Sequence, residues 1–318
     1  MAMTSNTLRV SMQVRLTRLL ATLCLMAGGD VRLAAAEASV APGSPPLRLA
    51  ISENVVRGIN LNDARAALSI WSTELAKAAG LNLAIGQDWV MTRDQLQSAI
   101  RGGTADMFCL TVQDYRRVAA YVDITRVLTD DHAGEQFVLL VREGSGIVKL
   151  ADLRGKSLIV HDSPSASLAE PWLSVSLWRE GLDSPEQLFG RVTRNTKLSQ
   201  AVLPVFFGQT DACLIAQRGL DTMSELNPQL AKRLKVLLAS PKLVSTFFAW
   251  RQDYPASVKK PIFDRLLDLK MSPAATQVLT LFQSSGFAGR DGECLRPALA
   301  LLDAYEHHRS STAAARAR

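Results

Sequence analysis

The order in which strand-like and helix-like segments follow one another constrains this chain more than any other feature. Apolar strand-like runs alternate with amphipathic helix-like segments twice, and each time three runs enclose two helices. The first set of runs lies at residues 47–52, 81–86 and 105–111, and the second at 157–161, 190–195 and 210–216. The order β-α-β-α-β is typical of a parallel sheet with covering helices. The sequence therefore predicts an α/β protein of two lobes, each with a mostly parallel sheet flanked by helices.

Capping residues mark the helices of the first set. Asn62 or Asp63 can begin a helix whose apolar positions recur at helical spacing. Thr92 and Gln95 have the spacing of a capping box, in which each side chain satisfies a backbone N–H of the other residue. Thr111 directly follows the third strand-like run and can begin a further helix. Each of the three strands is thus expected to lead into a helix.

The remaining strand-like runs place the boundaries between the lobes. We place one crossing of the chain near Arg142 and a second near Leu243. The chain then divides into a flexible leader, the first part of lobe I, lobe II, a helical return of lobe I and a disordered tail, at residues 37–46, 47–142, 143–242, 243–306 and 307–318. Two crossings form a hinge. Because ligands of open α/β sheets bind beyond the carboxyl ends of the strands, a ligand is expected in the cleft between the lobes.

The N-terminus has the pattern of an export signal. Arg9, Arg15 and Arg18 precede an apolar run at 19–29, and Ala34 to Ala36 offer a small-residue cleavage site. This order of basic, apolar and small segments is typical of a secretory signal peptide. Residues 1–36 are therefore predicted to be a signal peptide that directs the protein to the periplasm. The alternative is an N-terminal anchor helix.

Charge and cysteine content exclude other classes of protein. The chain has 36 basic and 30 acidic residues, but residues 1–36 hold four arginines and one aspartate, so the remainder has 32 basic and 29 acidic residues. No basic stripe with interleaved aromatic residues occurs, which disfavours nucleic-acid binding. Cys109, Cys213 and Cys294 remain after cleavage and are expected to be free thiols, the first two buried. The cysteines and histidines do not cluster, so neither a metal nor a cofactor is expected.

Three serines alternate in HDSPSASLAEPW, residues 161–172, where a strand-like run leads into a helix-like segment. A helix N-terminus presents unpaired backbone N–H groups and a partial positive charge, and it binds anions readily. Ser163, Ser165 and Ser167 can add hydroxyl donors there, which indicates an anion cradle. A simpler interpretation also fits: Ser167 and Glu170 have the spacing of a capping box.

A serine nucleophile is the enzymatic alternative for the same stretch. Such a nucleophile needs a nearby base and an oxyanion hole. His161 would share a strand face with residue 163 and could act as the base, but no G-x-S-x-G motif surrounds the serines. We therefore assign no catalytic residues and do not expect an enzyme.

The segment GSGIVKLADLRGK, residues 144–156, resembles the entry to the second lobe of PhnD-like periplasmic binding proteins. These are receptors for phosphonate, phosphite and phosphate in ABC importers. The resemblance extends from residue 47 to about residue 305. The anion-holding stretch of the family, Asp-Pro-x-Ser-Thr-Ser-Gly, is matched here by residues 162–168. Ser165 and Ser167 agree with the family, whereas Ala166 replaces its threonine and Leu168 its glycine.

The resemblance implies further ligand-binding residues. Asn195 stands where the family has a histidine, and Arg194 and Lys197 flank it with positive charge. Tyr115 matches a tyrosine of the family that follows the third strand of lobe I. The predicted ligand-binding residues are, in full, Ser52, Glu53, Thr111, Tyr115, His161, Ser163, Ser165, Ala166, Ser167 and Asn195.

The fold and function expected from this resemblance are those of a two-lobed periplasmic solute receptor. It would capture a small oxyanion by hinge closure and, as a monomer, deliver it to the permease of an ABC importer. A receptor that presents ligand to a chemoreceptor or sensor kinase has the same fold and is an open alternative. An exported serine hydrolase, with His161 beside Ser165, is the remaining one.

Overall fold

The structure, a computed structural model, describes residues 47–56, 90–267 and 286–316, and between 60 and 84 only residues 60, 62, 65, 66, 69, 70, 73, 83 and 84. The proposed signal peptide, its cleavage site and the leader lie outside the described residues. So do the apolar positions of the helix expected after Asn62, although the six described residues from 62 to 73 are helical. Within the described part, no helix is both long enough and apolar enough to span a membrane.

The first sheet has the strand order β12-β5-β11-β4-β1-β2, and β3 also pairs with β1. Its strands are β1 (Leu47–Ser52), β2 (Leu83–Ala84), β3 (Val90–Met91), β4 (Met107–Thr111), β5 (Val122–Asp130), β11 (Thr246–Arg251) and β12 (Phe287–Asp291). β1 is parallel to β2, β3 and β4, as the β-α-β order predicts. β11 and β12 join antiparallel, because the chain returns to this sheet from the opposite direction.

The second sheet has the order β10-β6-β9-β7-β8. Its strands are β6 (Phe137–Arg142), β7 (Ser157–His161), β8 (Arg191–Asn195), β9 (Ala212–Ala216) and β10 (Leu234–Ala239). β7 runs parallel to β8 and β9, whereas β6 runs antiparallel to β9 and β10. Both sheets are therefore mixed, with the expected parallel strands at their centres or along one side. The predicted α/β fold of two lobes is confirmed.

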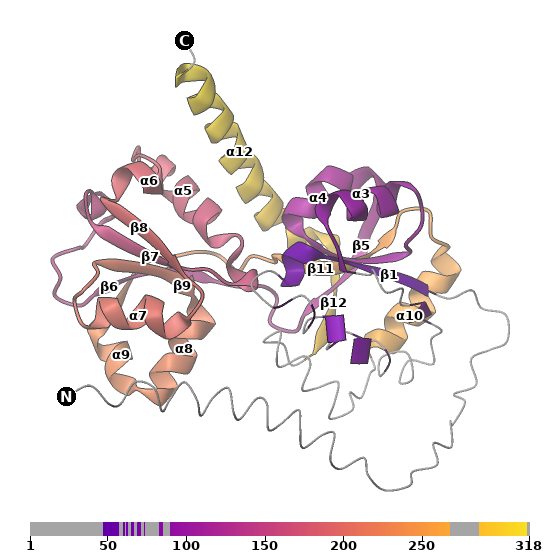
Figure 1. Cartoon of the computed structure of the whole chain (residues 1–318), viewed down its shortest axis with the longest axis horizontal. Coiled ribbons are helices and arrows are strands. Elements are labelled where there is room, and N and C mark those ends of the chain that lie inside the picture. Colours follow the sequence, from indigo (N-terminus) through magenta and orange to yellow (C-terminus); the bar gives the residue numbers. More distant parts are fainter. Residues whose placement is uncertain are drawn as a thin grey trace, which may run out of the picture. The chain divides into compact units, whose positions relative to one another are not determined.

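Helices cover both faces of each sheet (Figure 1). Those of the first lobe are α3 (Arg93–Arg101), α4 (Val112–Val118) and α10 (Ala256–Leu267), and those of the second are α5 (Ala169–Arg179), α6 (Pro185–Leu188), α7 (Leu198–Phe206), α8 (Gln217–Leu226) and α9 (Pro228–Arg233). Strand β4 shows why the first sheet needs helices on both of its faces. Phe108 and Leu110 pack on the side of α3 and α4, while Met107 and Cys109 pack on the side of α10. Alternate residues of a strand face opposite sides, so a continuously apolar strand requires apolar partners on both.

The first boundary between the lobes differs from the expected one. β6 pairs with β9 and β10 of the second sheet, so the chain crosses between β5 and β6 and not near Arg142. The apolar sequence of β6 is buried on both faces in either sheet, so the pattern alone does not assign it to one of them. The second crossing lies between β10 and β11, which includes the expected position Leu243.

The two crossing segments pair with each other. Glu135 and Leu243 exchange backbone hydrogen bonds of 2.9 and 2.8 Å. Gly134 has a φ of 94°, and a Cβ there would lie 2.5 Å from the Leu243 carbonyl. A residue other than glycine would strain this backbone and collide with the partner strand. The connection between the lobes is thus a short paired ribbon that depends on a glycine.

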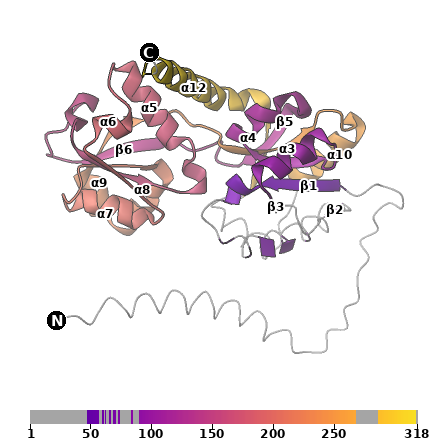
Figure 2. The ribbon, with the colours of Figure 1, turned by 45° about the horizontal axis from the view of Figure 1, so that its top comes forward.

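The C-terminal region also differs from the expectation. The return of lobe I contains the strands β11 and β12, and the chain from 296 to 316 is the helix α12 (Arg296–Arg316), so the tail predicted to be disordered is helical as far as Arg316. Trp178 of α5 stacks on Tyr305 and His308, with ring centroids 5.6 and 3.9 Å apart. These contacts, which the sequence pattern does not show, join α12 to α5, and Figure 2 shows the two helices side by side.

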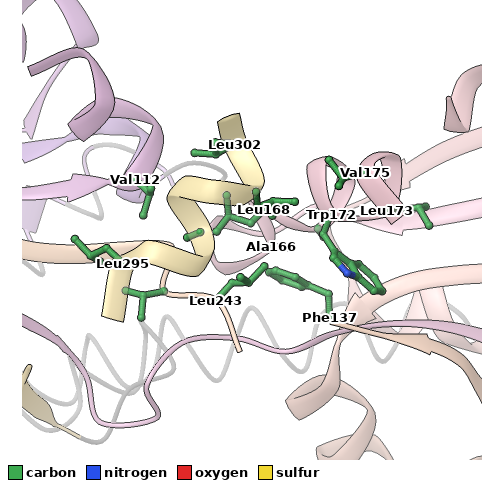
Figure 3. Packing of buried hydrophobic residues seen from close by; sticks show 14 of the residues in the cluster. Val112, Phe137, Ala166, Leu168, Trp172, Leu173, Val175, Leu243, Leu295 and Leu302 are labelled. Carbon is green, nitrogen blue, oxygen red and sulfur yellow. The ribbon is translucent and has the colours of Figure 1, made fainter. Parts of the chain in front are cut away.

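The largest hydrophobic cluster contains residues from both lobes and from α12. Leu295, which directly precedes α12, and Leu302 of α12 belong to the same cluster as Ala166 and Leu168, which lie between β7 and α5 (Figure 3). Arg116 of α4 adds ion pairs to Asp303, at 2.6 Å, and to Glu306. α12 is therefore packed against α4 of the first lobe and α5 of the second.

Candidate ligand-binding site

The connection between β7 and α5, residues 161–168, is built as a tight polar loop. β7 ends at His161, and Ser163 precedes the 3₁₀ turn η4 (Pro164–Ala166), in which proline takes an early position that suits its fixed φ. The Oγ atoms of Ser163 and Ser165 lie 3.2 Å apart. Ala166 is buried. The loop thus holds its serines where the carboxyl end of a strand meets the start of a helix.

The capping box expected from Ser167 and Glu170 is not formed, so that prediction is wrong. α5 begins after Leu168, which makes no side-chain cap, and no hydrogen-bond partner of Ser167 Oγ occurs among the described residues. Glu170 is instead held by Arg194 of β8, through two hydrogen bonds of 2.8 and 2.5 Å. This bidentate pair draws the carboxylate toward β8. It also neutralises the one acidic side chain in the first turn of α5.

Buried polar atoms without partners concentrate on this connection. Six buried side-chain atoms lack a hydrogen-bond partner in the described part of the chain. Two of them, His161 Nδ1 and Ser167 Oγ, lie in the connection itself. A third, Gln113 Oε1, belongs to a residue whose amide group donates a hydrogen bond to the connection. Burial of a polar group without a partner costs about 1–3 kcal/mol, so such groups in a folded protein call for an explanation. A ligand bound at the connection is one such explanation.

Gln113 brings the first lobe to this loop. It lies in the first turn of α4, and its Nε2 donates to the Ser167 carbonyl oxygen at 3.4 Å. The 3₁₀ turn η1 (Glu53–Val56), which follows β1, also lies against η4. The carboxyl ends of β1, β4 and β7 therefore meet at one place, as the sequence analysis expected of a ligand site between lobes. Gln113 was not among the predicted ligand-binding residues, although its position two residues after the end of β4 indicates that it lies near the carboxyl end of that strand.

In the first lobe, Asp114 engages two of the predicted ligand-binding residues. Its carboxylate accepts hydrogen bonds from Ser52 Oγ at 2.6 Å and from Thr111 Oγ1 at 2.8 Å. Asn54 Nδ2 donates to both of its oxygens. Asp114 itself is 4% exposed. The hydroxyl protons of Ser52 and Thr111 therefore point to this carboxylate, and Thr111 also caps α4 as expected by accepting from the Asp114 N–H at 3.1 Å.

The other predicted residues occupy different surroundings. Tyr115 is buried edge-on against Phe247, 5.6 Å between ring centroids, and burial raises the pKa of its phenol. Glu53 lies half-buried in η1. Asn195 pairs with His161 across β7 and β8, and its Oδ1 accepts from the Lys197 backbone N–H at 3.1 Å. Of the predicted set, the structure gathers His161, the serines and Asn195 on the second lobe.

Burial favours the neutral form of His161. Desolvation lowers the pKa of its imidazole and outweighs both a hydrogen bond with the Thr196 backbone and the charge of Asp162. Because His161 Nδ1 has no partner and Ser163 pairs with Ser165, the hydrogen bond between serine and histidine that a nucleophile requires is not formed among the described residues. Nor do these residues include a group of three His, Cys, Asp or Glu side chains placed to bind a metal.

Known structures share this fold. A binding protein of the phosphonate ABC transporter of Pseudomonas aeruginosa matches with a TM-score of 0.52 and 17% identity, over 82% of this chain and 87% of that one. A Xanthomonas citri protein bound to chloride gives 0.57 and 15%, over 84% and 100%. A Prochlorococcus marinus PhnD protein in complex with methylphosphonate gives 0.53 and 13%, over 80% and 96%. No curated protein sequence matches the chain.

The family model described as "ABC transporter, phosphonate, periplasmic substrate-binding protein" matches residues 69–293. This match covers more than half of the chain and every described strand except β1. Proteins of this family are substrate-binding components of transporters and not enzymes, in agreement with the unassembled serine and histidine pair. The chain belongs to the family of periplasmic substrate-binding proteins of phosphonate ABC transporters.

Proposed function

We propose that this protein binds a small phosphorus oxyanion (phosphonate, phosphite or phosphate) at the connection between β7 and α5 and passes it to an ABC permease. The observation that carries the proposal is the set of three unpartnered buried polar atoms at this connection, His161 Nδ1, Ser167 Oγ and Gln113 Oε1. They lie where the N-terminus of α5, an eleven-residue helix, offers free backbone N–H groups and a favourable dipole.

The serine hydroxyls and the helix N-terminus would bind the anion first. Ser163, Ser165 and Ser167 can donate, and the main-chain N–H groups at the start of α5 can do the same. The charge of Glu170 does not oppose the anion, because Arg194 balances it. With Glu170 paired, the second lobe favours anion binding more strongly than the sequence pattern alone indicates.

The first lobe would then close over the ligand. Gln113 and η1 are the parts of that lobe that already reach the loop. Closure is favoured only by contacts that the ligand makes better in the closed form than in the open one. Asp114 would act indirectly. Its carboxylate orients Ser52, Asn54 and Thr111 at the ends of β1 and β4.

Export, assembly state and partner complete the proposal. Residues 1–36 act as the signal peptide that brings the protein to the periplasm, the location typical of its family. The protein works there as a monomer and meets its permease in the ligand-bound form. The N-terminal sequence of the protein purified from a periplasmic extract tests export, since retention of residues 1–36 would refute it.

Thermal melting of the protein without residues 1–36 tests the ligand class. The panel is phosphate, phosphite, methylphosphonate and sulfate. A ligand at a hundred times its Kd stabilises the folded state by about 2.7 kcal/mol. For a chain of this size that corresponds to a rise in Tm of roughly 5 °C. No shift with any phosphorus oxyanion, together with no heat of binding by calorimetry, would refute the proposed function.

A pair of serine variants tests the place of binding. Ser165→Ala removes a hydroxyl from the loop, whereas Ser184→Ala removes one from the half-buried N-cap position of α6, where the side chain makes no capping hydrogen bond. A hydrogen bond to a charged group contributes about 1.5–3 kcal/mol, so Ser165→Ala should weaken binding by about tenfold to a hundredfold. Ser184→Ala should bind as the unmodified protein does. Equal affinities of the two variants would show that the site lies elsewhere.

A further inference from the structure

Helix α12 belongs to the first lobe by its chain connection but packs against both lobes. It follows β12, which pairs with β5, and the 3₁₀ turn η5 (Gly292–Leu295), which also contacts β5. From there α12 extends beside α5 of the second lobe (Figure 2). In the described part of the chain, the backbone itself passes between the lobes only along the paired ribbon of Gly134, Glu135 and Leu243. The packing of α12 is therefore a further link between the lobes, and it is not covalent.

The link to the second lobe is a stack of aromatic rings on one face of α12. Tyr305 and His308 are three positions apart, so they lie on the same side of the helix. Both rings are stacked on Trp178, with interplanar angles of 19° and centroid distances of 5.6 and 3.9 Å. Leu302, one turn earlier, is buried in the same hydrophobic cluster as Leu168, the residue that precedes α5. The residues at 302, 305 and 308 form one face, which the contacts between α12 and α5 place against the second lobe.

A neighbouring face of α12 contacts the first lobe. Arg116 of α4 forms ion pairs with Asp303, at 2.6 Å, and with Glu306. The two acidic side chains are 67% and 62% exposed, so these ion pairs contribute little to the free energy of the contact. The apolar part is stronger, because Leu295, directly before the helix, is fully buried in the cluster that also contains Val112 of α4. Since the chain also joins α12 to the first lobe, its contact with α5 is the one that would break if the lobes moved apart.

We propose that residues 303–308 of α12 act as a strap that restrains the two lobes from moving apart. Separation of the lobes at the ribbon would move α5 relative to α4, and α12 could follow only one of these helices. The same arrangement brings Gln113 of the first lobe to the Ser167 carbonyl oxygen of the second. The strap would therefore favour the arrangement in which the lobes meet before any ligand is bound. This inference goes beyond the proposed function and does not depend on it.

The ring stack is the part of the strap contact that a single substitution removes. Trp178 is half-buried near the C-terminal end of α5. Loss of an aromatic pair changes an equilibrium by about twofold to tenfold. Trp178→Ala should therefore raise the ratio of separated to joined lobes by about this factor. Phe207→Ala is the matched control, because it removes an exposed ring that follows α7 in the same lobe.

Pulsed electron paramagnetic resonance tests the strap, because it measures the distribution of distances between two spin labels. The protein lacks residues 1–36 and no ligand is added. The labels are attached to Ser98→Cys in α3 and Glu225→Cys in α8, two exposed positions on different lobes. Cys109 and Cys213 are buried, and Cys294→Ser removes the half-buried thiol.

Two shortened chains complement the substitutions. A chain that ends at Leu302 keeps the buried leucines of α12 but loses Tyr305 and His308, and with them the whole strap. A chain that ends at Ser311 keeps both rings and serves as its control. Thermal melts confirm that each protein is folded, and Trp178→Ala tests the inference by itself if the shorter chain is not.

The inference expects a larger fraction of long distances in Trp178→Ala and in the chain that ends at Leu302. Phe207→Ala and the chain that ends at Ser311 should match the unmodified protein. Distances that stay the same in the folded strap variants overturn the inference, and so does a shift toward shorter distances, which would mean that α12 keeps the lobes apart. Because no ligand is present, neither result affects the proposed function, which the ligand titrations test separately.

Discussion

Replacing Ser167 by alanine should weaken ligand binding without lowering the stability of the fold. Had Ser167 capped α5, its loss would cost about 0.5–2 kcal/mol of stability. In the structure α5 begins one residue later, and the described part of the chain offers no partner to Ser167 Oγ. No folded-state hydrogen bond is lost, and a buried hydroxyl without a partner is removed, so we expect the free energy of unfolding to stay the same or to rise, by at most about 1–3 kcal/mol.

The affinity should respond differently. If Ser167 Oγ donates to the anion, its removal should cost about 1.5–3 kcal/mol of binding free energy. That amounts to roughly a tenfold to a hundredfold rise in Kd, or slightly more. The two quantities are measured separately, the free energy of unfolding by urea titration without ligand and the Kd for methylphosphonate by calorimetry.

Thr92→Ala is the matched control. Thr92 and Gln95 do form the capping box expected at α3, with hydrogen bonds of 2.9 Å from Thr92 N to Gln95 Oε1 and 3.4 Å from Gln95 N to Thr92 Oγ1. This variant should lose about 0.5–2 kcal/mol of stability and keep the affinity. If Ser167→Ala instead unfolds about 1 kcal/mol more easily and binds normally, Ser167 is a cap, and the reasoning from its unpartnered hydroxyl is refuted.

Three further variants or treatments have defined outcomes. Burial alone would raise the pKa of Asp106, but hydrogen bonds and charge from Arg48 outweigh it and hold the pKa below its usual value. This carboxylate therefore stabilises the fold above the ordinary pKa of aspartate, about 3.9, and the contribution is lost as the pH falls through the lower folded value. Asp106→Asn should flatten this acid limb in urea titrations at a series of pH values, and an unchanged limb would contradict the assignment. Trp178→Ala should remove the stack on His308 and speed hydrogen exchange in the second half of α12, whereas unchanged protection there would show that other contacts hold the helix. Burial raises the pKa of the Cys213 thiol to about 12, so iodoacetamide should modify it only after denaturation, and labelling in the folded protein would contradict its burial.

Much of the architecture could be read from local patterns. Alternating strand and helix signals identified both sheets and the parallel core of each, because these signals depend on neighbours within a few residues. The helix caps predicted at Thr92 and Thr111 are confirmed for the same reason, since capping depends on residues within one turn of the helix. The stretch between β7 and α5 was also found from its serines, next to the carboxyl end of a strand.

Long-range pairing decided the features that the sequence pattern missed. β6 has an apolar sequence that suits either sheet, and only its partners β9 and β10 assign it to the second lobe. The segment after residue 306 reads as a polar tail, but contacts of Tyr305 and His308 with Trp178, 127 and 130 positions earlier in the chain, hold it as a helix.

The same distinction applies to the site. The sequence identified Ser167 and Glu170 as a capping pair because they are three residues apart, but Arg194, which lies 24 residues from Glu170, takes the carboxylate. Gln113 meets Ser167 across 54 residues of chain, so its role follows from the packing of one lobe on the other. Local sequence determined the elements and the chemistry available at their ends. The tertiary structure determined which of those groups are paired and which have no partner among the described residues, because hydrogen-bond partners far apart in sequence meet only when the sheets have formed.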